Sequence, residues 1–276
     1  MRIQNNNYNS PNFHAGLTKQ IQSEINHCDI QKISKEFAKA GVKTDFKENK
    51  TIAWCSYKCA ELFKKLNLTL PTTIIVEDFR KMKIEEPNAS GFNNILPTKL
   101  YPNSDEVTIQ RSIFFNSYNR FNEYLNGKTF WDEIDIISDF EYEQKASPTD
   151  HFLYHFLHEF VHSAHEDNLL NTLGVKKALN YYLKTFNSEY LEEFRQKYKN
   201  ELESLCDYAI ESPNESVACD FSKRIADNLT PSLDINPKFI KDSPYKNRTL
   251  KEFFFGLKDE NNTDSILRKI WFGKIP

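Results

Sequence analysis

Residues 158–162 read HEFVH, an H-E-x-x-H motif inside a stretch with helical spacing of its apolar residues. Side chains four residues apart lie one above the other on a helix, so His158 and His162 can hold one metal ion between them. Glu159 projects from the shoulder of the same face, where its carboxylate can reach a water molecule bound to that ion. Imidazole pairs of this kind suit zinc, and the adjacent carboxylate suits a general base. The motif therefore restricts this segment to a helix and favours metal-assisted hydrolysis.

The residues around the motif predict a helix over residues 149–166. Ser147 is a suitable N-cap, Pro148 fits the first helical position, and Asp150 follows three residues after the cap. Most of the seven histidines of the chain fall within an arc of about 80° on this helix, namely His151, His155, His158, His162 and His165. Apolar residues fill the opposite side, namely Phe152, Leu153, Phe156, Leu157, Phe160, Val161 and Ala164. We therefore expect one face in the core and one face lined by imidazoles, with the three histidines outside the motif exposed or supporting the site rather than binding metal.

The motif also has a simpler interpretation. A surface helix can carry histidines on its wet face with no metal at all, and H-E-x-x-H occurs by chance in roughly one chain in a hundred of this size. Support for a metal site must therefore come from a third ligand elsewhere in the chain.

Composition limits the classes of function. The chain has 276 residues, of which 39% are hydrophobic and 14% aromatic, and its formal net charge is −3. This is enough for a sizeable core. The sequence contains no dense Lys/Arg block and no apolar stretch near the roughly 20 residues that a membrane span needs. We expect a monomer that acts on a protein or peptide and has neither a nucleic-acid nor a membrane partner.

The N-terminal residues and the cysteines bear on the cellular location of the protein. Residues 1–15 are Asn-rich and polar, which predicts a disordered tail and lacks the apolar region of a Sec signal peptide. Five cysteines without paired spacing argue against a disulfide framework. We expect a soluble protein that is cytoplasmic or exported by a route that leaves no cleavable signal.

Hydrophobic periodicity predicts an α+β fold with a single domain over residues 16–276. Its first part, residues 16–148, is an α/β lobe containing a β-hairpin (42–46 and 51–54), a helix (55–67) and a strand (72–76). A long loop over 84–104 and a strand over 107–115 follow, and that strand is a candidate edge for pairing with substrate backbone. Residues 129–142 fit a strand or a helix equally. Its second part, residues 149–276, is almost entirely helical, with segments at 149–166, 173–186, 188–207, 213–228, 248–257 and 263–271.

A catalytic zinc site needs a third protein ligand and one open position. A third histidine six residues after the motif is absent, because position 168 is Asn and position 165 is not Gly. The remaining option is a glutamate on a later helix, and Glu215 in SPNESVACDF (212–221) has the most suitable surroundings. The same SPNE sequence is a capping box, so Glu215 could simply close a helix end. Glu211 and Glu166 are weaker alternatives, the latter because it lies too close to the motif.

An H-E-x-x-H helix followed about fifty residues later by N-E-x-x-A-x-x-F resembles the gluzincin metallopeptidases. Glu215, Ala218 and Phe221 are similar to the glutamate helix of the anthrax lethal factor type, and Tyr208 stands seven residues before the glutamate, as a tyrosine does in that group. The resemblance covers residues 149–228. It implies a zincin-like fold, in which a small mixed sheet with a backing helix precedes the active-site helix and a helical lobe.

The resemblance also implies roles for individual residues. His158, His162 and Glu215 would bind Zn²⁺, Glu159 would be the general base, and Tyr208 would donate a hydrogen bond to the oxyanion. The implied function is a zinc-dependent metalloendopeptidase. The alternative is a catalytically inactive zincin-like interaction protein with a structural metal or none.

Two features qualify the resemblance. Gluzincins often place a carboxylate one turn after the glutamate ligand, where it orients the first histidine, but this chain has Cys219 there, and Asp220 is displaced by about 100°. The partner of His158 is therefore not identified by the sequence. Tyr208 also lies in line with Leu205 and Leu202, so it could instead be a packed core tyrosine.

Overall fold

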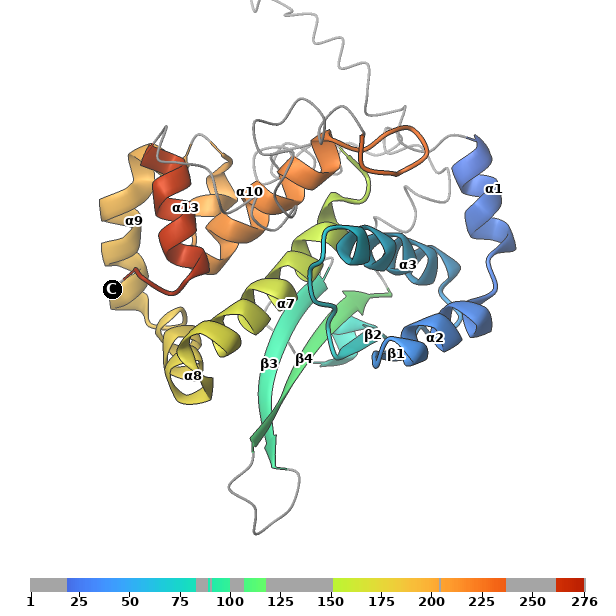
Figure 1. Cartoon of the computed structure of the whole chain (residues 1–276), viewed down its shortest axis with the longest axis horizontal. Coiled ribbons are helices and arrows are strands. Elements are labelled where there is room, and N and C mark those ends of the chain that lie inside the picture. The colour runs from blue at the N-terminus through green and yellow to red at the C-terminus, as the bar shows by residue number, and fades with distance from the viewer. Residues whose placement is uncertain are drawn as a thin grey trace, which may run out of the picture.

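The computed structural model describes residues 19–82, 89, 91–99, 107–117, 151–203, 205–236 and 262–275. The expected disordered tail (1–15), the ambiguous segment 129–142 and the expected helix at 248–257 lie outside these residues. The first part contains α1 (Lys19–His27), α2 (Ile30–Lys39), β1 (Lys43–Asp45), α3 (Lys50–Lys65), β2 (Thr73–Glu77), α4 (Phe79–Met82), β3 (Gly91–Lys99) and β4 (Val107–Asn116). The second part contains α7 (Tyr154–Leu173), α8 (Val175–Lys184), α9 (Ser188–Leu202), the 3₁₀ turn η1 (Asp207–Ile210), α10 (Pro213–Asp227) and α13 (Asn262–Trp271). The expected α+β class, a mixed sheet with helices followed by a mainly helical part, is confirmed (Figure 1).

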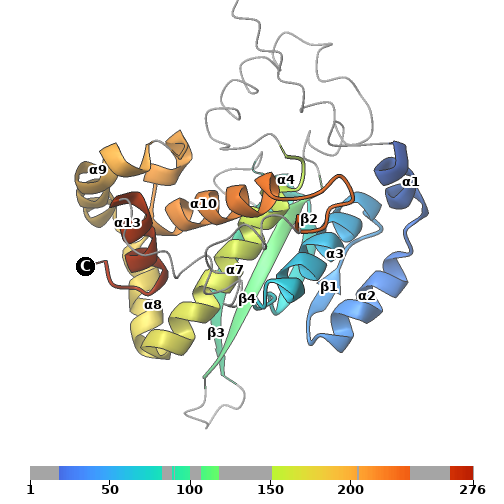
Figure 2. The ribbon, with the colours of Figure 1, turned by 45° about the horizontal axis from the view of Figure 1, so that its top comes forward.

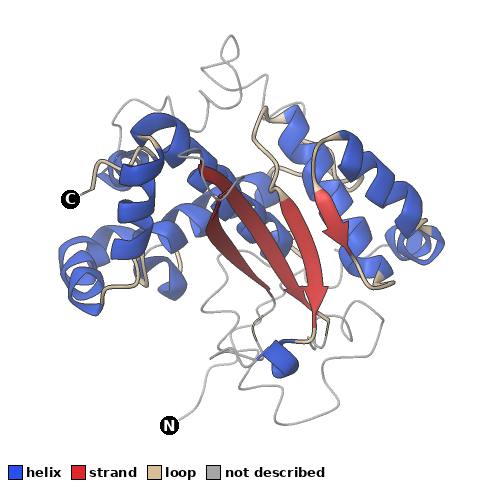
Figure 3. Cartoon of the chain, turned by 90° about the horizontal axis from the view of Figure 1, so that it is seen from below, coloured by secondary structure: helices blue, strands red, loops and turns tan. Residues whose placement is uncertain are grey.

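The four strands form one sheet in the order β1-β2-β4-β3. β1, β2 and β4 are parallel, and β3 is antiparallel to β4. Figure 3 shows the strands side by side with helices flanking the sheet. The prediction that residues 107–115 form the edge was therefore wrong, because β4 lies inside the sheet and β3 forms the edge beside it. Residues 91–99 had been assigned to a loop because of their proline and asparagines, but an edge strand tolerates Pro97, which has no N–H to offer a neighbour.

The predicted hairpin over 42–46 and 51–54 was also wrong in its second half. Asn49 is the N-cap of α3, and its side chain accepts a hydrogen bond from the Ile52 N–H at 2.9 Å. Thr51–Trp54 therefore belongs to the first turns of a helix, where local capping outweighs the strand preference of Thr51 and Ile52. β1 pairs in parallel with β2 instead.

α7 carries the motif and begins later than expected. Ser147–Asp150 lie outside the described residues, and residues 151–153 precede the helix, which runs from Tyr154 to Leu173. The Nδ1 atom of His151 accepts a hydrogen bond from the Leu153 N–H at 3.2 Å. His151 is therefore placed at the entrance to the helix rather than on its histidine face.

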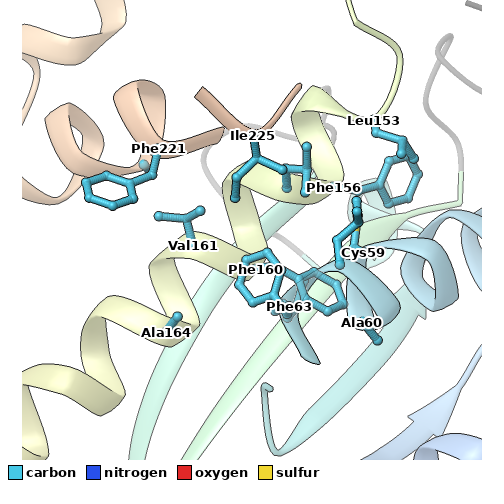
Figure 4. Close-up of a cluster of buried hydrophobic side chains, with 14 of the residues drawn as sticks. Cys59, Ala60, Phe63, Leu153, Phe156, Phe160, Val161, Ala164, Phe221 and Ile225 are labelled. Atoms are coloured by element: carbon cyan, nitrogen blue, oxygen red, sulfur yellow. The ribbon is translucent and has the colours of Figure 1, made fainter. Parts of the chain in front are cut away.

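α7 packs on several sides, and residues of its histidine-bearing face are buried as well as those of its apolar face. Phe156 lies against Phe115 of β4, and Phe160 against Phe63 of α3, with ring centroids 4.9 and 5.3 Å apart. α10 crosses α7 and contacts it along its length (Figures 1 and 2). Figure 4 shows side chains of α3, α7 and α10 meeting in one apolar cluster. A helix enclosed between a sheet and two other helices buries polar residues as well as apolar ones.

The described helices also bear on the expectation of a soluble chain. None of them has the combination of length and apolar character needed to cross a bilayer.

Candidate metal centre

A cavity of about 200 Å³ lies where α7, α10 and the edge strand β3 meet, and the end of α8 and the η1 turn complete its wall. His158, Glu159 and His162 of the motif all line it, as do Glu215 and Tyr208. The five residues singled out by the sequence are therefore neighbours around one pocket, although they come from three different elements.

Three of these side chains converge on a single point. The Nε2 atom of His158 lies 2.9 Å from Oε2 of Glu215 and 3.0 Å from Nε2 of His162. Nε2 of His162 lies 3.3 Å from the same Glu215 oxygen. Within the part of the chain that the structure describes, this is the group of His, Cys, Asp or Glu side chains with the geometry to hold a metal ion. We therefore identify His158, His162 and Glu215 as a candidate metal site.

The spacing of the three atoms suits a small divalent ion. Ligands held tetrahedrally about 2.0–2.1 Å from zinc stand about 3.3–3.4 Å apart. The observed separations of 2.9–3.3 Å need only a slight expansion to reach that arrangement. Two imidazoles and one carboxylate are also a donor set that zinc accepts. The residues present thus fit the ion that the sequence predicts, although the set does not by itself select among divalent metals.

Glu215 takes part in the helix cap and in the triad at once. The Ser212 hydroxyl accepts a hydrogen bond from the Glu215 N–H at 3.2 Å, which is one half of a capping box, and Pro213 occupies the first turn. The Glu215 carboxylate, however, points to the two imidazoles. Of the two alternatives left open by the sequence, the side chain follows the first: it joins the histidines, and only the backbone N–H of Glu215 takes part in the cap.

Glu215 and the two imidazoles shift one another's pKa values. Burial lowers the pKa of His158, although Glu215 opposes this shift. Burial also works against the charged form of His162, but Glu215 and the nearby carboxylates Glu159 and Glu166 outweigh it and raise the pKa of His162 to about 9. Burial acts against ionised Glu215 too, yet the two imidazoles hold the pKa of its carboxyl well below the usual range. A metal ion must displace the His162 proton to bind.

Glu159 is held against the edge strand. The residue is 8% exposed, and its Oε2 atom has no hydrogen-bond partner among the described residues. Burial raises the pKa of Glu159 to about 8, with His162 opposing the shift and Glu215 and Glu166 adding to it. A Cβ atom at Gly91 of β3 would stand 3.1 Å from Cγ of Glu159 and 3.0 Å from the Phe114 carbonyl oxygen. Gly91 therefore permits the strand to approach this carboxylate closely.

Tyr208 does not belong to the core. Its side chain is 38% exposed, and its ring centroid lies 6.0 Å from that of His158. α9 ends at Leu202, and Tyr208 lies in the separate η1 turn, so the helical alignment with Leu202 and Leu205 that suggested packing does not exist. Tyr208 stands at the rim of the pocket beside the triad.

The partner of His158 that the sequence could not identify is Tyr154. The Tyr154 hydroxyl lies 3.4 Å from Nδ1 of His158 and donates to Sγ of Cys219, also at 3.4 Å. If Nε2 of His158 faces the metal, Nδ1 carries the proton and donates it to the tyrosine oxygen. A tyrosine supported by Cys219 thus lies where a gluzincin carboxylate would be expected, while Asp220 pairs with Arg224 on the same helix.

The other histidines of the motif helix do not join the site as ligands. His165 is 1% exposed, stacks on Trp271 at 5.1 Å, and its Nε2 lies 3.2 Å from the Ile270 carbonyl oxygen. Burial lowers the pKa of His165 to about 3. Burial likewise lowers the pKa of His155 and of His151 to about 4. Of the expected alternatives, exposed or supporting the site, exposure does not hold for His165, which is buried and also lines the pocket.

The two alternative acids also have separate environments. Glu211 forms an ion pair with Arg195. Glu166 lines the pocket one turn beyond His162 but is not part of the converging triad. Burial raises the pKa of Glu166 to about 7, against the opposing effects of His162, Asn93 and Arg111.

Sequence reasoning missed several residues that bear on the site, among them Gly91 and Asn93, which line the pocket, and Tyr154, which contacts His158. The first two lie in the strand that had been assigned to a loop, so their proximity to α7 depends on pairing with β4. Tyr154 could have been suspected, because it stands four residues before His158 and hence one turn away on the same face.

Comparisons with models of known protein families, with curated proteins and with solved structures found no match.

Proposed function

We propose that this protein is a zinc-dependent metalloendopeptidase with a zincin-like arrangement. The observation that carries the proposal is the convergence of His158 Nε2, His162 Nε2 and Glu215 Oε2 within 2.9–3.3 Å of one another, next to a buried carboxylate on the same helix. Zinc held there would supply a Lewis acid and lower the pKa of a coordinated water from 15.7 toward about 7.

Glu159 is the group positioned to move protons. It follows His158 directly, lines the same pocket, and has one carboxylate oxygen without a partner among the described residues. That oxygen can accept the proton of the attacking water and return it to the amine of the leaving peptide. Packing against Gly91 restricts the carboxylate to the pocket side of α7.

Tyr208 is the proposed donor to the carbonyl oxygen of the scissile bond. It lies at the rim beside His158 rather than in the core. A hydroxyl aimed at the developing oxyanion stabilises charge that appears only in the transition state.

The edge strand β3 offers a place for the peptide backbone. The Tyr182 hydroxyl is hydrogen-bonded to the backbone of Ile95, so the backbone groups of Ile95 face away from β4. The backbone groups of Gly91 and Asn93 also face away from β4, because both residues are an even number of positions from Ile95. An extended substrate could add to β3 beside the motif helix, in the role first predicted for residues 107–115.

The test is metal analysis of the purified chain followed by hydrolysis of a peptide library with and without a chelator. Zinc at one ion per chain and chelator-sensitive cleavage are expected. Glu159→Gln should retain zinc and lose at least about 10²-fold in turnover, because the proton acceptor is gone. Glu189→Gln, at an exposed position at the start of α9, is the matched control and should leave both unchanged.

Tyr208→Phe examines the oxyanion role in the same assay. Turnover should fall about 10²-fold with zinc content unchanged. An unchanged rate would remove Tyr208 from the mechanism. Full turnover of Glu159→Gln would remove the general base, and zinc binding without cleavage of any peptide would favour the non-catalytic alternative.

A further inference from the structure

Beyond His162, the pocket continues one helical turn along α7 to Glu166. Four helical residues advance about 6 Å, so this carboxylate lies next to the metal triad without joining it. Glu166 is 6% exposed, lines the pocket, and keeps its Oε2 atom without a hydrogen-bond partner among the described residues. A buried carboxylate oxygen in this state lacks the compensation that native proteins normally provide.

Asn93 faces the same part of the pocket from the opposite wall. It pairs with Ile113 in the sheet, and paired residues of antiparallel strands point to the same face, which for Ile113 is the face packed in the core with α7. Both side-chain amide atoms of Asn93 are buried and make no hydrogen bond of standard geometry among the described residues, although Asn93 lies close enough to Glu166 to lower the pKa of its carboxyl. The Glu166 carboxylate and the Asn93 amide therefore meet at one end of the cavity with hydrogen-bonding capacity left for a ligand.

The charge of the cavity favours a cationic occupant. Glu159, Glu166 and Glu215 line it, and no described lysine or arginine does. The nearest basic residue is already engaged, since the Arg111 guanidinium donates to the Ser163 carbonyl oxygen at 2.8 Å and pairs with Asp167 at 3.2 Å. A cation entering from solvent would thus meet Glu159 and Glu166, and no lysine or arginine among the described pocket-lining residues competes for these two carboxylates.

Aromatic side chains form the remaining wall. Tyr182 and Phe186, at the end of α8, line the cavity with ring centroids 5.1 Å apart. Phe186 is 68% exposed, which places it at the mouth, whereas the Tyr182 hydroxyl is tied to the Ile95 backbone. Such rings can cover the aliphatic part of a long basic side chain while its charged end passes inward.

We propose that Glu166 and Asn93 form a subsite for the lysine or arginine side chain of a peptide substrate, adjacent to the bond that is cleaved. This inference rests on the proposed peptidase function and names its substrate class, which is peptides with a basic residue next to the scissile bond. The Glu166 carboxylate and the Asn93 amide oxygen accept the hydrogen bonds of the ammonium or guanidinium group.

The test measures binding separately from hydrolysis. The zinc-loaded full chain is titrated calorimetrically with lysine hydroxamate and with norleucine hydroxamate, which share a metal-binding group and differ in the side-chain ammonium. Lysine hydroxamate should bind at least about tenfold more tightly, since it alone completes a charge-assisted hydrogen bond. Glu166→Gln should abolish this difference, whereas Glu166→Asp should keep part of it. Glu193→Gln, at an exposed site on α9, should change nothing.

Zinc content and the unfolding temperature of Glu166→Gln check that the variant is folded. Equal binding of the two hydroxamates, no binding of either, or a preference that survives in folded Glu166→Gln would overturn the subsite. A Glu166-dependent preference in a protein that cleaves no peptide would support the subsite and reject the peptidase function. The two proposals can thus fail independently.

Discussion

The two halves of the pocket differ in how their buried polar groups are satisfied. Where α7 meets α10, His158, His162 and Glu215 contact one another at 2.9–3.3 Å. Where α7 meets β3, Glu159, Glu166 and Asn93 each keep a side-chain atom without a hydrogen-bond partner among the described residues. The polar groups of the first half pair with one another, whereas those of the second half keep hydrogen-bonding capacity that the described residues do not use.

This difference follows from the secondary-structure elements that form each half of the pocket. The triad comes from two helices in extensive contact, and its carboxylate is anchored by the Ser212 cap. The other half faces an edge strand that has a neighbour on one side only. Buried polar groups without a hydrogen-bond partner cost free energy, and sites of chemistry are where such costs are usually found.

The strongest test of the comparison is the stability of the metal-free protein. Glu215→Gln should reduce the free energy of unfolding at pH 7 by about 2–4 kcal/mol, because it leaves protonated His162 without its partner. Glu159→Gln should instead increase it by about 1 kcal/mol, because it replaces a buried, unpaired acid with a neutral amide. Urea unfolding in the presence of a chelator measures both. Equal losses in the two variants would mean that the two halves are not energetically different.

The pH dependence of these effects has a definite sign. The pKa of His162 is raised to about 9, so the stability gained from its pairing with Glu215 is complete below its ordinary pKa of 6.5 and is lost as the pH rises through 9. The Glu159 pKa is raised to about 8, so the penalty that Glu159→Gln removes is absent below pH 4.5 and grows toward pH 8.

The second prediction concerns metal affinity and pH. Since His162 must lose its proton to bind, zinc affinity should rise about tenfold per pH unit between pH 6 and 8, approximately hundredfold in total. An unperturbed histidine would level off near pH 6.5. Competition with a chromogenic chelator across this range measures the slope. A plateau from pH 7 upward would show that the triad does not retain the proton.

The smallest expected effect concerns Tyr154. Tyr154→Phe should weaken zinc binding about tenfold, because Nδ1 of His158 loses the oxygen that orients it. Tyr181→Phe is the matched control, since Tyr181 is also buried but its hydroxyl has no hydrogen-bond partner among the described residues. Equal zinc affinity in both variants would reduce Tyr154 to a packing residue and leave His158 oriented by the helix alone.

The sequence predicted the α7–α10 side of the pocket well because its signals are local. The four-residue spacing of His158 and His162 defines a helical face, and the capping box before Glu215 locates the start of α10. The approach of these two helices is not local, and it was suggested only by the resemblance to gluzincins.

The β3 side could not be predicted in the same way. Gly91–Lys99 contains Pro97 and two asparagines, which favour a loop, and the segment becomes a strand through nine paired residues on β4. Strand formation depends on such partners more than on intrinsic preference. The same limitation applies to His165, whose burial is caused by Trp271, 106 positions later in the chain. Helical periodicity defines a face but does not reveal what will cover it.

The position of Pro97 in β3 has a consequence for encounters between molecules. An exposed edge strand can pair with the same strand of a second molecule, and such pairing is a common route to aggregation. Pro97 is two residues after Ile95, so its backbone also faces away from β4, and its missing N–H removes one hydrogen-bond donor from that free edge. At Ile95 the same edge is covered by Tyr182. Pairing from outside is thereby confined to the short stretch beginning at Gly91, where a single extended peptide can lie but a long intermolecular sheet cannot grow.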